Sequence, residues 1–94
     1  MDKGFKFKTD EGYKYTINKH KIPSKLNAEG LCDDPESKNP QIVISPSLLP
    51  RREMAVSIEE IAHAFFWDKT EKKVRKFSAV LTKYLYANGW RKNF

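Results

Sequence analysis

Cysteine and long apolar runs are scarce in this 94-residue chain. Its one cysteine, Cys32, excludes an internal disulfide framework and a multi-cysteine zinc site, which indicates a reducing compartment. No segment approaches the roughly 18 apolar residues that span a bilayer, and the first residues lack the apolar core of a secretory signal. We therefore expect a cytoplasmic protein that has no membrane partner.

The chain is also too short for two domains. With 39% hydrophobic residues, it suits a single domain over residues 1–94. A folded chain of this size buries only about 60–65% of the surface that it exposes when unfolded. We therefore expect a shallow site and no large apolar pocket for a bulky cofactor.

Positive charge predominates, but it is distributed unevenly. Eighteen Lys and Arg against twelve Asp and Glu give a net charge of +6. Residues 1–27 and 51–94 are basic, whereas residues 28–50 are acidic. A basic balance is compatible with a polyanionic partner but does not identify one.

Two runs near the N-terminus alternate between apolar and polar residues with the period of a half-buried strand. Phe5 and Phe7 alternate with lysines in the first run, and residues 13–18 alternate in the second. Between them, Asp10-Glu11-Gly12 favours a short turn. The pair therefore predicts a β-hairpin.

The next segments predict one further strand and a loop. Residues 41–45, bounded by prolines, form a short β-branched run that is typical of a strand. The acidic segment 29–36 is rich in turn residues and lacks periodicity, so it predicts a loop. We therefore expect a small antiparallel sheet, a hairpin plus a third strand, over residues 4–45.

From about residue 50 the apolar period becomes helical. The pattern predicts one helix over residues 50–67 and a second over 70–88, with Gly89 suited to a left-handed C-terminal cap. The sequence thus indicates an α+β fold in which the sheet packs on two C-terminal helices. One stripe of the second helix is predicted to be its apolar face. It consists of Val74, Phe77, Ser78, Leu81, Tyr84, Leu85 and Asn88.

Three side chains in these helices form a candidate metal site. Glu59 and His63 are four residues apart, so they project from one side of the first helix. Glu71 begins the second helix at the margin of its apolar stripe and can reach the same point. Carboxylate, imidazole and carboxylate can hold zinc in three positions while water takes the fourth. Glu60, beside Glu59, can then act as the general base that accepts a proton from that water.

Several segments, taken in order, carry a family resemblance: Gly30-Leu31-Cys32-Asp33-Asp34-Pro35, Gln41-Ile42-Val43-Ile44, Ile58-Glu59-Glu60-Ile61-Ala62-His63-Ala64, Glu71, Val74 and Asn88-Gly89-Trp90-Arg91. Their order resembles that of small phage-encoded zincin-like proteins, which have a sheet, an H-E-x-x-H helix and a Glu-bearing final helix. The resemblance covers roughly residues 28–92. It implies a minimal gluzincin-type metallopeptidase fold, with metal ligands at Glu59, His63 and Glu71 and a catalytic Glu60. For a phage-encoded chain, it also implies the host bacterial cytoplasm.

The chain departs from that motif at its first histidine. Glu59 stands in its place, so the sequence reads E-E-x-x-H. Two anionic ligands reduce the Lewis acidity of the ion and favour harder ions such as manganese more than a His₂Glu site does. We therefore expect a degenerate site for one divalent ion, zinc or manganese. Such a site would support weak peptidase activity, or would bind a protein or peptide partner without catalysis.

Each member of this group also has a structural interpretation. Ser57 and Glu60 match a capping box in which Ser57 is the N-cap. His63 can be a hydrogen-bonded, partly buried histidine with no ligand. The helix dipole alone favours a glutamate at position 71.

The second helix offers a rival function. Lys72, Arg75, Lys76 and Lys83 lie opposite its apolar stripe and form one basic face, which can follow a phosphate backbone. The alternative to a metal centre is thus a nucleic-acid-binding or host-protein-interaction module without catalysis. If the hairpin lies alongside, four further lysines extend this face: Lys3, Lys6, Lys8 and Lys14.

Overall fold

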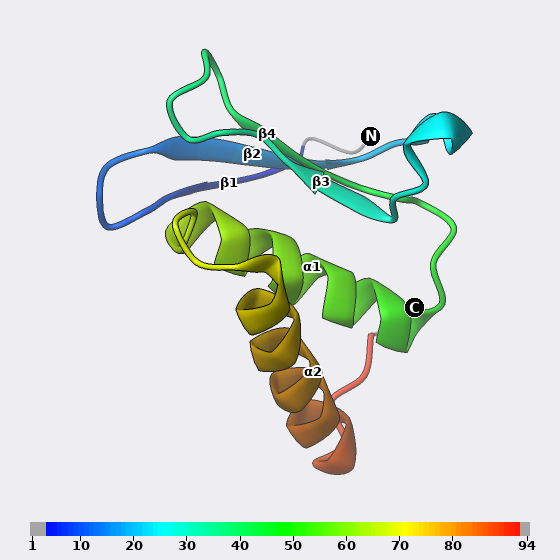
Figure 1. Ribbon diagram of the computed structural model, residues 1–94. Helices are drawn as coiled ribbons and strands as arrows, with labels where there is room; N and C mark the ends of the chain where they lie inside the picture. Colours follow the sequence, from blue (N-terminus) through cyan, green and yellow to red (C-terminus); the bar gives the residue numbers. More distant parts are fainter. Residues whose placement is uncertain (1–3, 93–94) are drawn as a thin grey trace.

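The computed structural model describes residues 4–92 and contains one sheet and two α-helices on the same face of it (Figure 1). The predicted α+β class, with the sheet preceding two C-terminal helices, is confirmed. In chain order the elements are β1 (Phe5–Lys8), β2 (Lys14–Lys19), the 3-10 helix η1 (Ser24–Leu26), β3 (Gly30–Cys32), β4 (Gln41–Ile44), α1 (Pro50–Phe65) and α2 (Glu71–Ala87).

The sheet is mixed, so the prediction of an antiparallel sheet is wrong in this respect. Its strand order is β1-β2-β4-β3, and the central pair, β2 and β4, is parallel. The outer strands β1 and β3 pair antiparallel with β2 and β4, respectively. β3 lies in the acidic segment that was predicted to be a loop. Three residues are too few to show an alternating pattern, and pairing with β4, the next strand along the chain, forms this edge strand.

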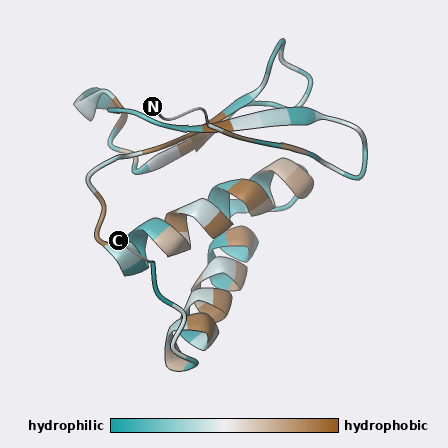
Figure 2. Cartoon of the chain, turned by 180° about the vertical axis from the view of Figure 1, so that it is seen from behind, coloured by the Kyte–Doolittle hydropathy of each residue, from teal (hydrophilic) through white to brown (hydrophobic). Residues whose placement is uncertain are grey.

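The hydrophobic core lies between the sheet and α1. Tyr15, Ile42 and Ile44 are fully buried and pack with Val56 and Ala64 of α1. Hydrophobic residues, brown in Figure 2, accordingly occupy the central strands and α1. This packing holds α1 directly beneath the strands and places α2 farther from the sheet (Figure 1).

The opposite face of the sheet is not covered by either helix (Figure 1). Strand alternation places Lys6, Lys8 and Lys14 on that face, where all three are exposed. They therefore do not extend the basic face of α2, because the sheet and α1 lie in between. Lys3 lies outside the described residues.

Proline determines where α1 begins. Pro50 is the first residue of the helix and Leu49 its N-cap, without a side-chain cap hydrogen bond. Ser57 is therefore in the helix interior, and the alternative of a capping box with Ser57 as N-cap is wrong. The helix ends at Phe65, two residues before the predicted end.

Helix α2 packs on α1 through small and short side chains. Val74, Ser78 and Thr82 are buried, and the Ser78 hydroxyl donates a hydrogen bond to the Ala55 carbonyl at 2.6 Å. The bulky Phe77 and Tyr84 of the predicted stripe lie roughly 100–120° around the helix from Ser78 and remain 52% and 62% exposed. Asn88 of the predicted stripe is also exposed and follows the end of the helix, so Phe77, Tyr84 and Asn88 do not belong to the buried face.

The C-terminal cap of α2 agrees with the sequence prediction. Gly89 follows the helix with a φ of 86°, in the left-handed region that favours glycine. The chain then turns back toward the start of α1, where the Lys92 ammonium lies 3.1 Å from the Glu53 carboxylate. Neither helix, nor any other within residues 4–92, has the length and apolar character needed to cross a membrane.

Candidate metal centre

The three predicted ligands converge where α1 meets the start of α2. Glu59, His63 and Glu71 each offer a ligand atom, and these atoms all lie within 4.8 Å of one another. Glu59 and His63 share one face of α1 because they are one helical turn apart. The Thr70 hydroxyl accepts a hydrogen bond from the Lys73 amide at 3.2 Å and so fixes Glu71 as the first residue of α2. The tight connection between the helices thus brings a ligand of α2 to the two ligands of α1.

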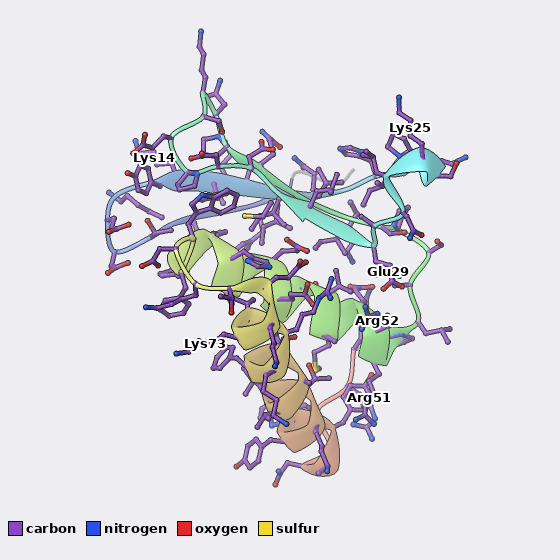
Figure 3. All side chains as sticks on the ribbon, in the orientation of Figure 1. Lys14, Lys25, Glu29, Arg51, Arg52 and Lys73 are labelled. Carbon is purple, nitrogen blue, oxygen red and sulfur yellow. The ribbon has the colours of Figure 1, made fainter. Side chains whose placement is uncertain are left out.

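The convergence point borders two surface hollows. An open groove of about 1070 Å³ runs between α1, α2, η1 and the start of β3, and Glu59 lines it. An adjoining hollow of about 360 Å³ is lined by His63 and by Trp67. Glu60 and Glu71 line both, so a small ion or molecule can reach the cluster from either side. Figure 3 shows Glu29 and Arg52 facing each other near the far end of the larger groove, where their charged groups are 2.6 Å apart.

Arg75 neutralises two of the candidate ligands. Its guanidinium lies 2.9 Å from the Glu71 carboxylate and 3.6 Å from that of Glu59. The helical pattern predicts Arg75 on the basic outer face of α2, whereas the structure places its guanidinium against the carboxylates of the cluster. The signal was present, because Glu71 and Arg75 have the i, i+4 spacing of a helical ion pair. Arg75 is therefore a counter-cation of the two carboxylates.

Glu60 is the most buried acidic group at the site. It is only 6% exposed, and no described residue donates a hydrogen bond to its carboxyl. Burial, reinforced by the neighbouring charges of Glu59 and Glu71 and opposed by Arg75, raises its pKa to about 7. The Glu60 carboxyl can therefore gain or lose a proton near neutral pH.

Gly30 of β3 makes room for Glu60. A Cβ atom at position 30 would lie 2.9 Å from Cγ of Glu60 and 2.7 Å from Cγ1 of Val56. Only a residue without a side chain lets this edge strand approach α1 so closely. The close approach covers Glu60 on one side while leaving it at the border of both hollows.

The donor set fits a divalent cation. Two carboxylates and one imidazole are ligands that zinc and manganese both accept, and the open groove leaves space for water or a further ligand. The His63 ring makes no hydrogen bond with another described residue, so its nitrogens are available as ligands. The Glu59, His63 and Glu71 group can thus hold a metal ion, with Glu60 beside it.

Cys32 does not belong to this donor set. Burial raises the pKa of its thiol to about 12, and Sγ donates to the Asp33 carbonyl at 3.6 Å. A thiol that keeps its proton is a poor metal ligand and a poor nucleophile.

The rest of the predicted basic face lies outside the cluster. Lys72, Lys76 and Lys83 are exposed on α2, whereas Arg75 turns toward the carboxylates.

Comparison of the chain with protein-family models, curated proteins and solved structures found no match.

Proposed function

We propose that this protein binds one divalent metal ion through Glu59, His63 and Glu71, and that the centre is suited to hydrolysis of an amide or peptide bond. The convergence of ligand atoms from two separate helices within 4.8 Å carries the proposal. A histidine and a glutamate on one helical turn are common by chance. A third ligand brought in from the next helix is a more specific arrangement.

Glu60 is the general base of the proposed reaction. A bound ion would polarise a substrate carbonyl and acidify a water molecule. The Glu60 carboxyl, buried beside the ligands, is positioned to accept the proton from that water. The positive charge of the ion would favour the ionised carboxylate and lower its pKa from about 7, so the base would be competent at neutral pH.

The ligand chemistry favours manganese more than a site with two histidines does. Two carboxylates donate more charge to the ion and reduce its power to polarise a carbonyl. We therefore propose a weakly active centre, which corresponds to the degenerate zincin-like site that the sequence resemblance implies. Arg75 competes with the ion, because its guanidinium contacts both carboxylates.

Metal binding is tested by calorimetric titration of the chelator-treated protein with zinc and with manganese. We expect one ion per chain for the wild type and at least about a tenfold loss of affinity for His63→Ala. His20→Ala is the matched control, because His20 is the other histidine and lies exposed outside the groove. Arg75→Gln should raise the affinity by removing the competing cation. Equal affinities for wild type and His63→Ala would contradict the proposal.

Hydrolysis is tested separately with an unstructured protein substrate and added manganese or zinc. We expect slow, metal-dependent cleavage by the wild type. Glu60→Gln should abolish cleavage while still binding the metal with nearly wild-type affinity. If the protein bound metal but did not cleave the substrate, the hydrolytic part of the proposal would be refuted and only the metal-binding part would stand.

A further inference from the structure

The face of α2 that points away from α1 carries four lysines. Lys72, Lys73, Lys76 and Lys83 are all exposed, and Figure 3 shows Lys73 pointing outward from the helix. At ~100° per residue the four fall within an arc of about 100°, opposite the buried Val74, Ser78 and Thr82. They therefore form a single stripe, which we call the α2 lysine stripe.

The α2 lysine stripe has no acidic partners. None of its four lysines lies within ion-pair distance of a carboxylate in the described part of the chain. Elsewhere Lys19, Lys92 and Arg52 are each paired with a glutamate. The one acidic residue of α2, Glu71, is turned toward Arg75. The stripe consequently presents charge of one sign to solvent, which is the charge complementary to a polyanion.

The shape of α2 suits a groove more than a flat surface. It packs on α1 along one side and extends away from the sheet (Figure 1). Its 17 residues form a rod of about 25 Å in length and 10–12 Å in width. The major groove of B-form DNA is about 12 Å wide and accepts such a helix, whereas the major groove of double-stranded RNA is too narrow.

Exposed apolar residues adjoin the stripe on one side, and one of them, Val80, lies within its arc. Phe77, Val80 and Tyr84 are 52%, 56% and 62% exposed and follow one another along the helix at intervals of about one turn. A helix that lies in a membrane surface buries its apolar stripe in the lipid and keeps lysines at the margins. In α2 only three large apolar residues are exposed, lysines lie on both sides of Val80, and the main apolar face is already buried against α1. The arrangement therefore favours a nucleic acid over a lipid surface.

We propose that α2 binds the phosphate backbone of double-stranded DNA through the α2 lysine stripe. The stripe lacks Arg, Asn and Gln, the side chains that read base edges in pairs of hydrogen bonds. Binding is accordingly independent of sequence, because contacts to phosphate position a protein without specifying bases. This function uses a different face from the metal centre and does not depend on it.

The test measures fluorescence anisotropy of a labelled 20-base-pair duplex of arbitrary sequence at 50 and 200 mM salt. Neutralising three to four phosphates predicts a fall in affinity of roughly 40- to 150-fold over this range. The triple variant Lys72→Glu, Lys76→Glu, Lys83→Glu should lose binding. The matched control is Lys6→Glu, Lys8→Glu, Lys14→Glu on the uncovered face of the sheet. Each Lys→Glu change removes two charges, so both variants lower the net charge from +6 to 0.

Comparison of the two triple variants distinguishes DNA binding through α2 from attraction that depends only on net charge. The proposal requires the control variant to keep most of the affinity that the α2 variant loses, with both variants folded by circular dichroism. Equal losses in the two variants would overturn it, as would no duplex binding at 50 mM salt. Binding of anionic lipid vesicles that depends on α2, without binding of duplex DNA, would overturn it in favour of a membrane surface.

Discussion

The buried carboxyl of Glu60 should make the metal-free protein less stable as the pH rises. Burial raises the pKa of this group from 4.5 to about 7, so the folded state holds its proton more tightly than the unfolded state does. The stabilisation is fully present below about pH 4.5 and is lost as the pH rises through about 7. A difference of this size corresponds to about 3 kcal/mol between the two limits. Glu60→Gln removes the titrating proton and should remove this dependence.

The measurement is urea unfolding of wild type and Glu60→Gln in a chelating buffer at pH 5 and pH 8. Other groups titrate in both proteins, so the difference in unfolding free energy between them isolates Glu60. We expect this difference to change by about 2–3 kcal/mol in favour of the variant between pH 5 and pH 8. In thermal unfolding the same change corresponds to roughly 10–20 °C for a domain of this size.

A matched control is Glu11→Gln, which removes an exposed carboxyl in the turn between β1 and β2. This variant also removes one negative charge but leaves the buried site intact, so it measures the general effect of that change in charge at each pH. If the Glu60→Gln difference varied with pH no more than the Glu11→Gln difference, the Glu60 carboxyl would be ionised and solvated in the folded protein. That result would refute the inference that burial raises the pKa of Glu60, and with it the assignment of Glu60 as a base buried beside the ligands.

Two further predictions concern the elements that position the site. Gly30→Ala should destabilise the protein by about 1–3 kcal/mol in urea unfolding, because the new methyl group would overlap Glu60 and Val56; unchanged stability would show that β3 can move away from α1 at little cost. Thr70→Ala should cost about 1 kcal/mol by removing the N-cap of α2. It should also weaken manganese binding in calorimetry, because Glu71 begins at that cap, and an unaltered affinity would mean that the cap does not position this ligand.

The helices were predictable from the sequence because their signals are local. Pro50 marks the start of α1, and Gly89 follows the end of α2 with the left-handed conformation that its residue type favours. The sheet was predictable only in part. The hairpin has a local alternating pattern, but β3 is too short to show one, and the parallel pairing of β2 with β4 depends on contacts between distant segments.

The candidate site shows the same division between local and distant information. The common face of Glu59 and His63 follows from their spacing alone. The approach of Glu71 depends on how the connection between α1 and α2 turns, which the spacing does not specify. The orientation of Arg75 was missed because a basic residue on an amphipathic helix was assigned to the solvent face, although a glutamate one turn earlier attracts it.

The position of Arg75 has a consequence for how a metal would be taken up. Since the Arg75 guanidinium already balances the Glu59 and Glu71 carboxylates, the cluster carries no large uncompensated negative charge. Loading would therefore be an ion exchange, in which an arriving cation displaces a resident one that stays tethered nearby. Such a centre would hold its ion less tightly than a carboxylate cluster without a neighbouring cation. Its occupancy would therefore vary with the concentration of the metal.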